Sequence, residues 1–157
     1  MNHLHPFLQE AIQLSRTKME ANEGGPFGAV IAKGNQIIGR GWNRVTSAKD
    51  PTAHAEIEAI RQACQTLDSF SLEGCHIYSS CEPCPMCLAA IYWARLDKLI
   101  FAATREDAAQ AGFDDALLYQ QIALPLNQQS LSTQNSGRET AQAIFKQWIE
   151  KPNKISY

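Results

Sequence analysis

The sequence predicts an α/β protein of three layers, in which helices cover both faces of a mixed β-sheet. Short runs rich in Val and Ile alternate along the chain with longer segments whose apolar residues recur at helical intervals. Strands separated by helices of this length favour crossover connections, which place helices against the sheet. The chain has 157 residues, of which 45% are hydrophobic and 19% charged, so one compact domain over residues 1–157 is expected.

The first half of the chain predicts a helix, a β-hairpin and a second helix. Residues 6–21 carry an apolar stripe that ends before two glycines, which form a stop signal. Residues 27–43 hold two runs that contain Val and Ile around the turn residues Gly34 and Asn35, a pattern typical of a hairpin. Residues 53–68 return to helical spacing after an Asp-Pro-Thr start signal.

The second half continues the alternation. It predicts a buried strand over 75–80, a buried helix over 85–96 that opens on proline, a strand over 98–103 and a helix over 105–112. Residues 126–137 are dominated by Gln, Asn and Ser without a periodic apolar face, which predicts a flexible tether. Residues 138–157 begin with a predicted short helix over 138–150, and a helix on such a tether can dock on its own subunit or on a partner subunit.

Composition narrows the classes of function. The 14 basic and 16 acidic residues give a formal net charge of −2, so we expect no nucleic-acid partner. The longest apolar run, "CLAAIYWA", is far shorter than the roughly 20 residues that cross a bilayer. Five cysteines, an odd number with three of them within seven residues, and an N-terminus without a leader pattern indicate a cytoplasmic protein with reduced thiols.

Three of those cysteines predict a metal site. Cys81, Cys84 and Cys87 are three residues apart, and Pro85 suits the first position of a helix. Cys84 then caps the helix and Cys87 lies in its first turn, where the positive end of the helix dipole favours thiolate. Cys81 precedes the turn, at the end of a strand.

Two other kinds of metal site also use clustered cysteines. The ferredoxin-type pattern C-x2-C-x2-C-x3-C-P requires a fourth cysteine where this chain has Ile91, so an iron–sulfur cluster is excluded. A structural zinc held by all three cysteines and a histidine would fill the coordination shell and leave the ion inert. The structural zinc site therefore stays open as an alternative. The roles of Cys64, Cys75 and Cys81 are also left open.

The histidine that fits is His54. His3 and His5 lie near the N-terminus and His76 lies in a predicted strand, whereas His54 is followed two residues later by Glu56. Residues two apart do not share a helix face, so both can serve one metal only from a helix's first turn, with the ion beyond its end. Together with P-C-x-x-C thirty residues on, H-x-E forms the known zinc deaminase signature.

The signature explains the residue types. Zinc held by His54, Cys84 and Cys87 would lower the pKa of water in its fourth position from about 16 toward roughly 7. Glu56 is not a ligand and can take the water proton and deliver it to the ring and to the departing amine. Glu58, two residues further, is expected on a solvated helix face near Arg61.

The stretches "GGPFGAVI", "DPTAHAE", "SCEPCPMCLAAIYWAR" and "DAAQAGFDD" resemble the bacterial guanine deaminases of the cytidine and deoxycytidylate deaminase superfamily, from about Gly24 to Tyr119. The resemblance implies a cytidine deaminase-like fold with a five-stranded mixed sheet and one Zn²⁺ per subunit in a homodimer. It implies hydrolysis of guanine at C2 to xanthine and ammonia. Residues 120–150 lie outside this resemblance.

The resemblance also implies roles for particular residues. Asn43 would hydrogen-bond the purine, Phe27 would form an aromatic wall, and Ala55 would contact the substrate. Asp115 would contact the amine of guanine and assist proton transfer. Segment 138–157 would close over the active site, from its own subunit or exchanged with a partner subunit, and Tyr157 would approach the substrate as part of this lid, which excludes water.

Two rival functions remain at this stage. Adenosine deamination in tRNA shares the H-A-E and P-C-x-x-C motifs, and other aminated heterocycles such as cytosine are related candidates. A non-catalytic module whose zinc only stabilises the fold belongs to a different class. Ammonia release from defined substrates separates the first group, and the effect of changing Glu56 separates the second.

Overall fold

The computed structural model describes residues 4–157, which form two compact units that divide after Asp115. The first unit contains all strands of the described chain and the predicted metal ligands. The second unit, Ala116–Tyr157, contains helices only. His3 lies outside the described residues.

A four-stranded mixed sheet forms the centre of the first unit. Its strands are β1 (Gly28–Lys33), β2 (Gln36–Trp42), β3 (Cys75–Cys81) and β4 (Lys98–Ala103), in the order β2-β1-β3-β4. β1 pairs antiparallel with β2 and β3, whereas β3 pairs parallel with β4. Gly34 turns the predicted hairpin with φ of 57°, a left-handed conformation that glycine adopts without strain. The predicted hairpin and the mixed sheet are therefore confirmed.

The expected fifth strand is wrong for the described part of the chain, which has four. After β4 the backbone enters α5 (Arg105–Gln110) at once, because Thr104 and Asp107 form a capping box. The following elements are also helical: α6 (Ala116–Ile122), the 3₁₀ turn η1 (Leu126–Gln128) and α7 (Arg138–Glu150). The number five came from the family resemblance, whereas the residue pattern alone had indicated four strands.

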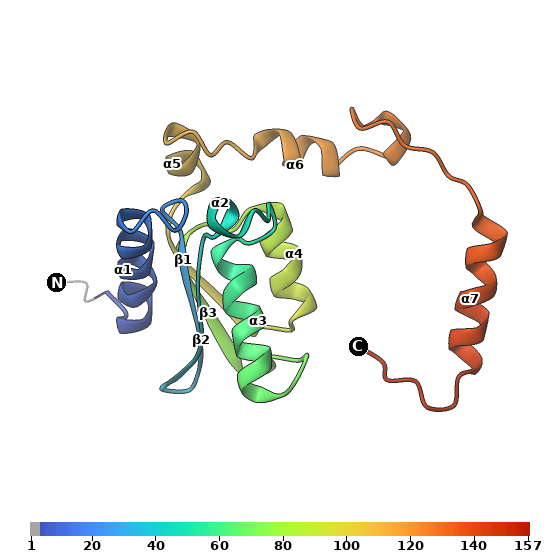
Figure 1. The fold of residues 1–157 in the computed structure, drawn as a ribbon, viewed down its shortest axis with the longest axis horizontal. Coiled ribbons are helices and arrows are strands. Elements are labelled where there is room, and N and C mark those ends of the chain that lie inside the picture. The colour runs from blue at the N-terminus through green and yellow to red at the C-terminus, as the bar shows by residue number, and fades with distance from the viewer. Residues whose placement is uncertain (1–3) are drawn as a thin grey trace. The chain divides into compact units, whose positions relative to one another are not determined.

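Helices cover both faces of the sheet (Figure 1). On one face lies α1 (Pro6–Glu20), whose buried side chains pack with residues of β1 and β3: Leu8, Ala11, Val30, Ala32 and Tyr78. On the other face lie α3 (Ala55–Leu67) and α4 (Pro85–Trp93), which share a second cluster with the sheet, including Ala29, Ile31, Ala59, Ile77 and Ile91. A short α2 (Val45–Ala48) precedes α3. The predicted α/β layering is confirmed.

Close packing of α3 on β2 is allowed by two glycines. A Cβ atom on Gly41 would lie 2.0 Å from the carbonyl oxygen of Ala55, and one on Gly39 would lie 2.5 Å from that of Ala59. We call this contact of Gly39 and Gly41 with Ala55 and Ala59 the Gly–Ala seam. It brings the backbones of β2 and α3 together and thereby sets the distance between the sheet and the N-terminus of α3.

One expectation about burial is wrong. The helix that begins at Pro85 was predicted to be buried, yet Tyr92 and Trp93 at its C-terminal end are 76% and 67% exposed. Ile91, in the same turn, is buried in the core. The helix is apolar all round, but only one side of it contacts the rest of the first unit.

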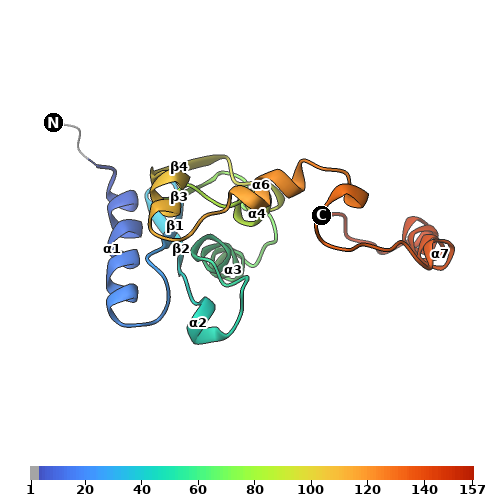
Figure 2. The same ribbon diagram turned by 90° about the horizontal axis from the view of Figure 1, so that it is seen from above.

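The second unit has no core of its own. Its helix α7 has the predicted bounds, whereas α6 and η1 were not predicted. None of its residues is buried, and its large apolar side chains are exposed: Leu117, Leu118, Ile122, Leu124, Leu126, Leu131, Ile144, Phe145, Trp148, Ile149, Ile155 and Tyr157. Within this unit, Figure 2 shows that an extended connection leads to α7.

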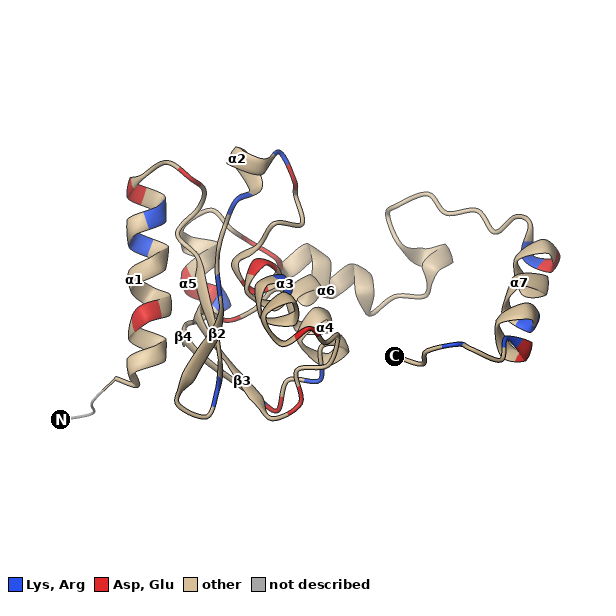
Figure 3. Cartoon of the chain, turned by 60° about the horizontal axis from the view of Figure 1, so that its bottom comes forward, with Lys and Arg blue, Asp and Glu red and all other residues tan. Residues whose placement is uncertain are grey.

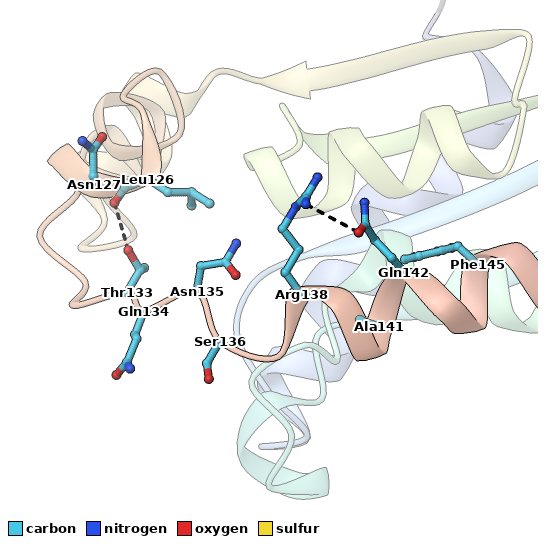
Figure 4. A pocket seen from close by; sticks show the side chains of 10 residues that line it. All are labelled: Leu126, Asn127, Thr133, Gln134, Asn135, Ser136, Arg138, Ala141, Gln142 and Phe145. Carbon is cyan, nitrogen blue, oxygen red and sulfur yellow. Dashed lines mark hydrogen bonds between the residues drawn. The ribbon is translucent and has the colours of Figure 1, made fainter.

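Within this unit, Leu126, Asn127, residues 133–136 and the start of α7 line an open cavity of about 860 Å³ (Figure 4). Thr133 donates a hydrogen bond to the carbonyl of Leu126, and Arg138 donates one to Gln142. These exposed hydrogen bonds link residues 126–142 to one another but do not form a buried core.

Both α1 and α7 carry charges of both signs (Figure 3). Among the described residues, none of the helices combines the length and the apolar character that a bilayer crossing requires.

Candidate metal centre and active site

His54 stands at the N-cap of α3. Asp50 accepts hydrogen bonds from the Thr52 backbone and hydroxyl at 2.8 and 2.7 Å, and the His54 backbone N–H then donates to the carbonyl of Thr52 at 2.8 Å. This Asx-type turn leaves His54 extended, with φ −75° and ψ 157°, immediately before the helix. The predicted entry through Asp-Pro-Thr therefore places the imidazole beyond the helix end.

Cys84 stands at the matching position of α4, with Pro85 at the first helical residue. Cys87 follows in the first turn and is buried. The Nδ1 atom of His54 lies 3.6 Å from the Cys84 sulfur and 3.5 Å from the Cys87 sulfur. Two helix N-termini thus bring one imidazole and two sulfurs to a common point, with the three ligand atoms within 4.8 Å of one another.

These separations fit zinc. Zinc binds sulfur at about 2.3 Å and nitrogen at about 2.0–2.1 Å in a tetrahedron, which puts the two ligand atoms about 3.6 Å apart. The observed N–S separations of 3.5 and 3.6 Å match that edge. Cys81 lies outside the triangle: its sulfur is 3.6 Å from the carbonyl of Thr104, and burial raises the pKa of the thiol to about 11. A three-cysteine structural site is therefore not the arrangement seen.

The protonation of the three groups is coupled. The hydrogen bond from the Cys87 thiol, with a further one from His54, lowers the pKa of Cys84 to about 4. The same contact with Cys84 raises the pKa of Cys87, and the Cys84 thiolate raises the pKa of His54. A thiolate stabilised in this way without a metal is a ready cation ligand, because the ion replaces the shared protons.

Glu56 lies beside this triangle in the first turn of α3. Its side chain is only 7% exposed, and its Oε1 accepts a hydrogen bond from the Ser79 hydroxyl at 3.3 Å. Burial raises the pKa of Glu56, which suits a group that must both accept and release a proton near neutral pH. Glu58 instead forms ion pairs with Arg61 at 2.6 Å and with Arg44 at 3.5 Å. Its predicted position near Arg61 is therefore confirmed.

Asn43, which follows β2, is held with its amide in one orientation. Its Oδ1 accepts hydrogen bonds from the backbone N–H groups of Gly25 and Val45, both at 3.2 Å. Two backbone donors require the oxygen at that position, so the amide nitrogen is left to donate. The side chain is 92% buried by the surrounding loops, and a Cβ atom on Gly24 would lie 1.9 Å from the Asn43 carbonyl oxygen.

Phe27 and Asp115 are two predicted substrate contacts, and Phe113, near the end of the first unit, lies close to both in the structure or in the sequence. The ring of Phe27 packs edge-to-face on Phe113, with centroids 4.9 Å apart and an interplanar angle of 88°. Phe113 lies two residues before Asp115. Burial raises the pKa of Asp115, and the negative charge of Cys84 raises it further.

Other predicted residues have a different environment. Ala55 is buried at the first position of α3, so its backbone N–H has no acceptor within the helix. Tyr157 belongs to the second unit and is 72% exposed there.

Two residues of the site were missed by sequence reasoning. Phe113 lay within the motif "AGFDD", but nothing in the local pattern indicated its ring contact with Phe27. Ser79 is one of two adjacent serines in a strand, and its partner Glu56 is 23 residues away. A contact over that separation has no signature in a single sequence.

A His-Cys-Cys triangle at two helix ends, with a buried carboxylate that is not part of the triangle, defines a zinc-dependent hydrolytic deaminase. The model of the cytidine and deoxycytidylate deaminase zinc-binding region matches residues 1–103. The chain belongs to this family, and its fold is the cytidine deaminase-like α/β fold.

Known relatives show how far the similarity extends. The guanine deaminase of Bacillus subtilis (strain 168) is 46% identical over 157 residues, which cover 100% of both chains. An X-ray structure of guanine deaminase from Bacillus subtilis covers 100% of this chain and 99% of that chain, at 46% identity with a TM-score of 0.95. The tRNA-specific adenosine deaminase of Aquifex aeolicus (strain VF5) is 44% identical over 97 residues, which cover 62% of this chain and 64% of that protein. The first similarity includes residues 120–150, so the expectation that these residues depart from the family is wrong.

Proposed function

We propose that this protein is a guanine deaminase that hydrolyses guanine to xanthine and ammonia in purine catabolism or salvage, with one zinc ion per subunit. The observation that carries the proposal is the similarity to a guanine deaminase over the whole chain, including the second unit. The similarity to the tRNA-specific adenosine deaminase covers 97 residues only. The metal triangle alone supports a deaminase but does not choose its substrate.

Zinc, when bound by His54, Cys84 and Cys87, supplies a Lewis acid that makes a water molecule nucleophilic at neutral pH. Glu56 accepts one proton of that water and delivers it to the purine ring nitrogen, and then takes the remaining proton from the hydroxyl on C2 and delivers it to the departing amine. Ammonia then leaves instead of an amide anion, while the oxygen of water becomes the carbonyl oxygen at C2. The raised pKa of Glu56 supports this double role.

The remaining site residues hold the base. The Asn43 amide donates to an acceptor of the purine, because its oxygen is already engaged by two backbone N–H groups. The free N–H of Ala55 is a second donor, and Phe27 with Phe113 forms an apolar wall. Asp115 accepts from the amine that is replaced and assists its protonation, which its raised pKa supports.

Ammonia release across guanine, adenine, cytosine, their nucleosides and an adenosine-containing anticodon stem-loop tests this function. We expect guanine to be the preferred substrate by kcat/KM. Preference for the RNA substrate, with binding that weakens steeply as salt is added, would assign tRNA deamination instead. Preference for cytosine or another heterocycle would retain the chemistry but change the substrate.

We further propose that residues 1–157 form one functional domain in a homodimer, with segments 138–157 exchanged between subunits. The support is the absence of buried residues in the described second unit, whose apolar side chains need a surface to cover them. Residues 126–137 act as the tether. Tyr157 would then complete the site of the partner. The five free thiols support a reducing compartment, and we propose the cytoplasm.

Subunit complementation tests the exchange. If the segments are exchanged, a mixture of Tyr157→Ala and Glu56→Gln chains regains activity, because a mixed dimer has one site with both an intact Glu56 and an intact Tyr157. Recovery approaching one quarter of wild-type activity is expected for random mixing, since about half of the dimers are mixed and each has one intact site. Sedimentation that shows only monomer at micromolar concentration contradicts the dimer, and a dimer without recovery contradicts the exchange.

A further inference from the structure

Two adjacent serines on β3 are buried but have different partners. Ser79 is 2% exposed and donates a hydrogen bond to Oε1 of Glu56 at 3.3 Å. Ser80 is 8% exposed, and its hydroxyl accepts a hydrogen bond from the Gly28 backbone at 3.0 Å. Successive residues of a strand point to opposite faces, so only Ser79 is directed to the face that carries α3 and the metal ligands.

We propose that Ser79 is a positioning residue that fixes the orientation of the Glu56 carboxylate for proton transfer. This inference rests on the proposed function, because Glu56 is the group that moves the protons. Ser79 itself does not touch the substrate. A hydroxyl that holds Oε1 restricts rotation about the last side-chain torsion, so the second oxygen is presented in one direction.

The place of Ser79 in the sheet makes it a rigid anchor. It pairs with Ala29 of β1 and with Phe101 of β4, so its backbone is fixed by strands on both sides. Glu56, in contrast, projects from the first turn of a helix and its long side chain has several rotamers. A fixed donor on the sheet therefore selects among the orientations open to the carboxylate.

A purely structural role explains the serine less well. Its neighbours on this face of the sheet, Ala29 and Ile77, belong to the apolar core cluster, where alanine would fit and would bury no polar atom. The hydroxyl finds its partner in the carboxylate, which itself lies within the protein. The 3.3 Å separation is longer than an ideal hydroxyl–oxygen hydrogen bond, and such contacts commonly tighten when substrate binds.

Ser79→Ala, with Ser80→Ala as the matched control, tests the proposal. We expect Ser79→Ala to lower kcat about tenfold, equivalent to about 1.4 kcal/mol, with KM unchanged within about twofold and zinc content intact. Ser80→Ala removes a hydroxyl of similar burial from the same strand, so it should lower the melting temperature but leave kcat unchanged. Ser79→Thr, which keeps the hydroxyl, should restore most of the turnover.

A double variant shows whether the effect passes through Glu56. In a Glu56→Gln background the carboxylate is absent, so Ser79→Ala should change the residual kcat by less than about twofold. If Ser79→Ala lowered kcat as much in the Glu56→Gln background as it does in the wild type, the proposal would be overturned. Equal kcat losses in Ser79→Ala and Ser80→Ala would also overturn it, because they would show a structural role.

The outcome is distinguishable from failure of the proposed function. If the wild-type protein deaminates a heterocycle other than guanine, the substrate assignment fails and the same variants are compared on that heterocycle. An active wild type with an equally active Ser79→Ala variant refutes only the role of Ser79. A wild-type protein with bound zinc that releases no ammonia from any substrate refutes both.

Discussion

Replacing Glu56 by Gln separates catalysis from metal binding at this site. The substitution keeps the size of the side chain, and the new amide oxygen can still accept the hydrogen bond from Ser79. None of the three ligand atoms of the metal triangle belongs to residue 56. The variant should therefore fold and bind one zinc ion per chain, while it loses the group that accepts and releases protons.

The size of the loss follows from the number of proton transfers. One positioned acid or base contributes about 10²–10⁴-fold. Glu56 serves the water, the ring nitrogen and the leaving amine in turn, so the upper end applies. We expect kcat to fall about 10⁴-fold, or about 5.4 kcal/mol of transition-state stabilisation. At 7% exposure, bulk water has little access to replace the carboxylate.

The assay is ammonia release from guanine, with zinc measured by elemental analysis in the same samples. Glu58→Gln is the matched control, because Glu58 lies two residues further on the same helix and forms surface ion pairs with Arg61 and Arg44. Losing those pairs costs about 0–1 kcal/mol of stability and should leave kcat unchanged. Near-normal turnover in zinc-loaded Glu56→Gln would refute the assigned role. A wild type without activity would support the non-catalytic zinc module.

Three further predictions concern the ligands, the substrate and pH. Cys84→Ala should reduce zinc from about one ion per chain to near zero and lower thermal stability; unchanged metal content would show that the ligand set is wrong. Asn43→Asp keeps an oxygen for the two backbone donors but removes the amide donor, so kcat/KM for guanine should fall about 10- to 100-fold with the melting temperature nearly retained, and equal kcat/KM would contradict the contact. Burial raises the pKa of Glu56, so in metal-free protein its stabilising contribution is present below the ordinary pKa of 4.5 and is lost as pH rises through the folded pKa. Glu56→Gln should then unfold at increasingly higher temperature than wild type as pH rises above 4.5 in the presence of EDTA; a wild type at least as stable at pH 8 would contradict this.

Much of the fold was predictable because its signals are local. The bounds of α7, the turn at Gly34 and the start of α4 after Cys84 each depend on a few neighbouring residues. The partial exposure of α4 was not predictable in this way. An apolar run indicates burial, but whether Tyr92 and Trp93 are covered depends on what packs against the far side of the helix.

The residues of the site also fall into those that local sequence predicts and those that depend on tertiary packing. His54, Glu56, Cys84 and Cys87 were found because the chemistry requires fixed spacings at two helix starts. The orientation of Asn43, by contrast, depends on one donor at the start of α2 and another at Gly25, which is 18 residues away. The contact of Ser79 with Glu56 likewise depends on the packing of a helix against a strand, which no local pattern records.

The Gly–Ala seam has a consequence for attempts to change the substrate range of this protein by mutation. A methyl group on Gly41 would meet the Ala55 carbonyl at 2.0 Å, so α3 would have to retreat by about 1.5 Å to restore an ordinary contact. Displacing a reacting group by about 1 Å can already cost about 10²-fold in rate. Randomised libraries that spare the visible pocket but vary β2 would therefore lose active clones at two glycines that contact neither ion nor base.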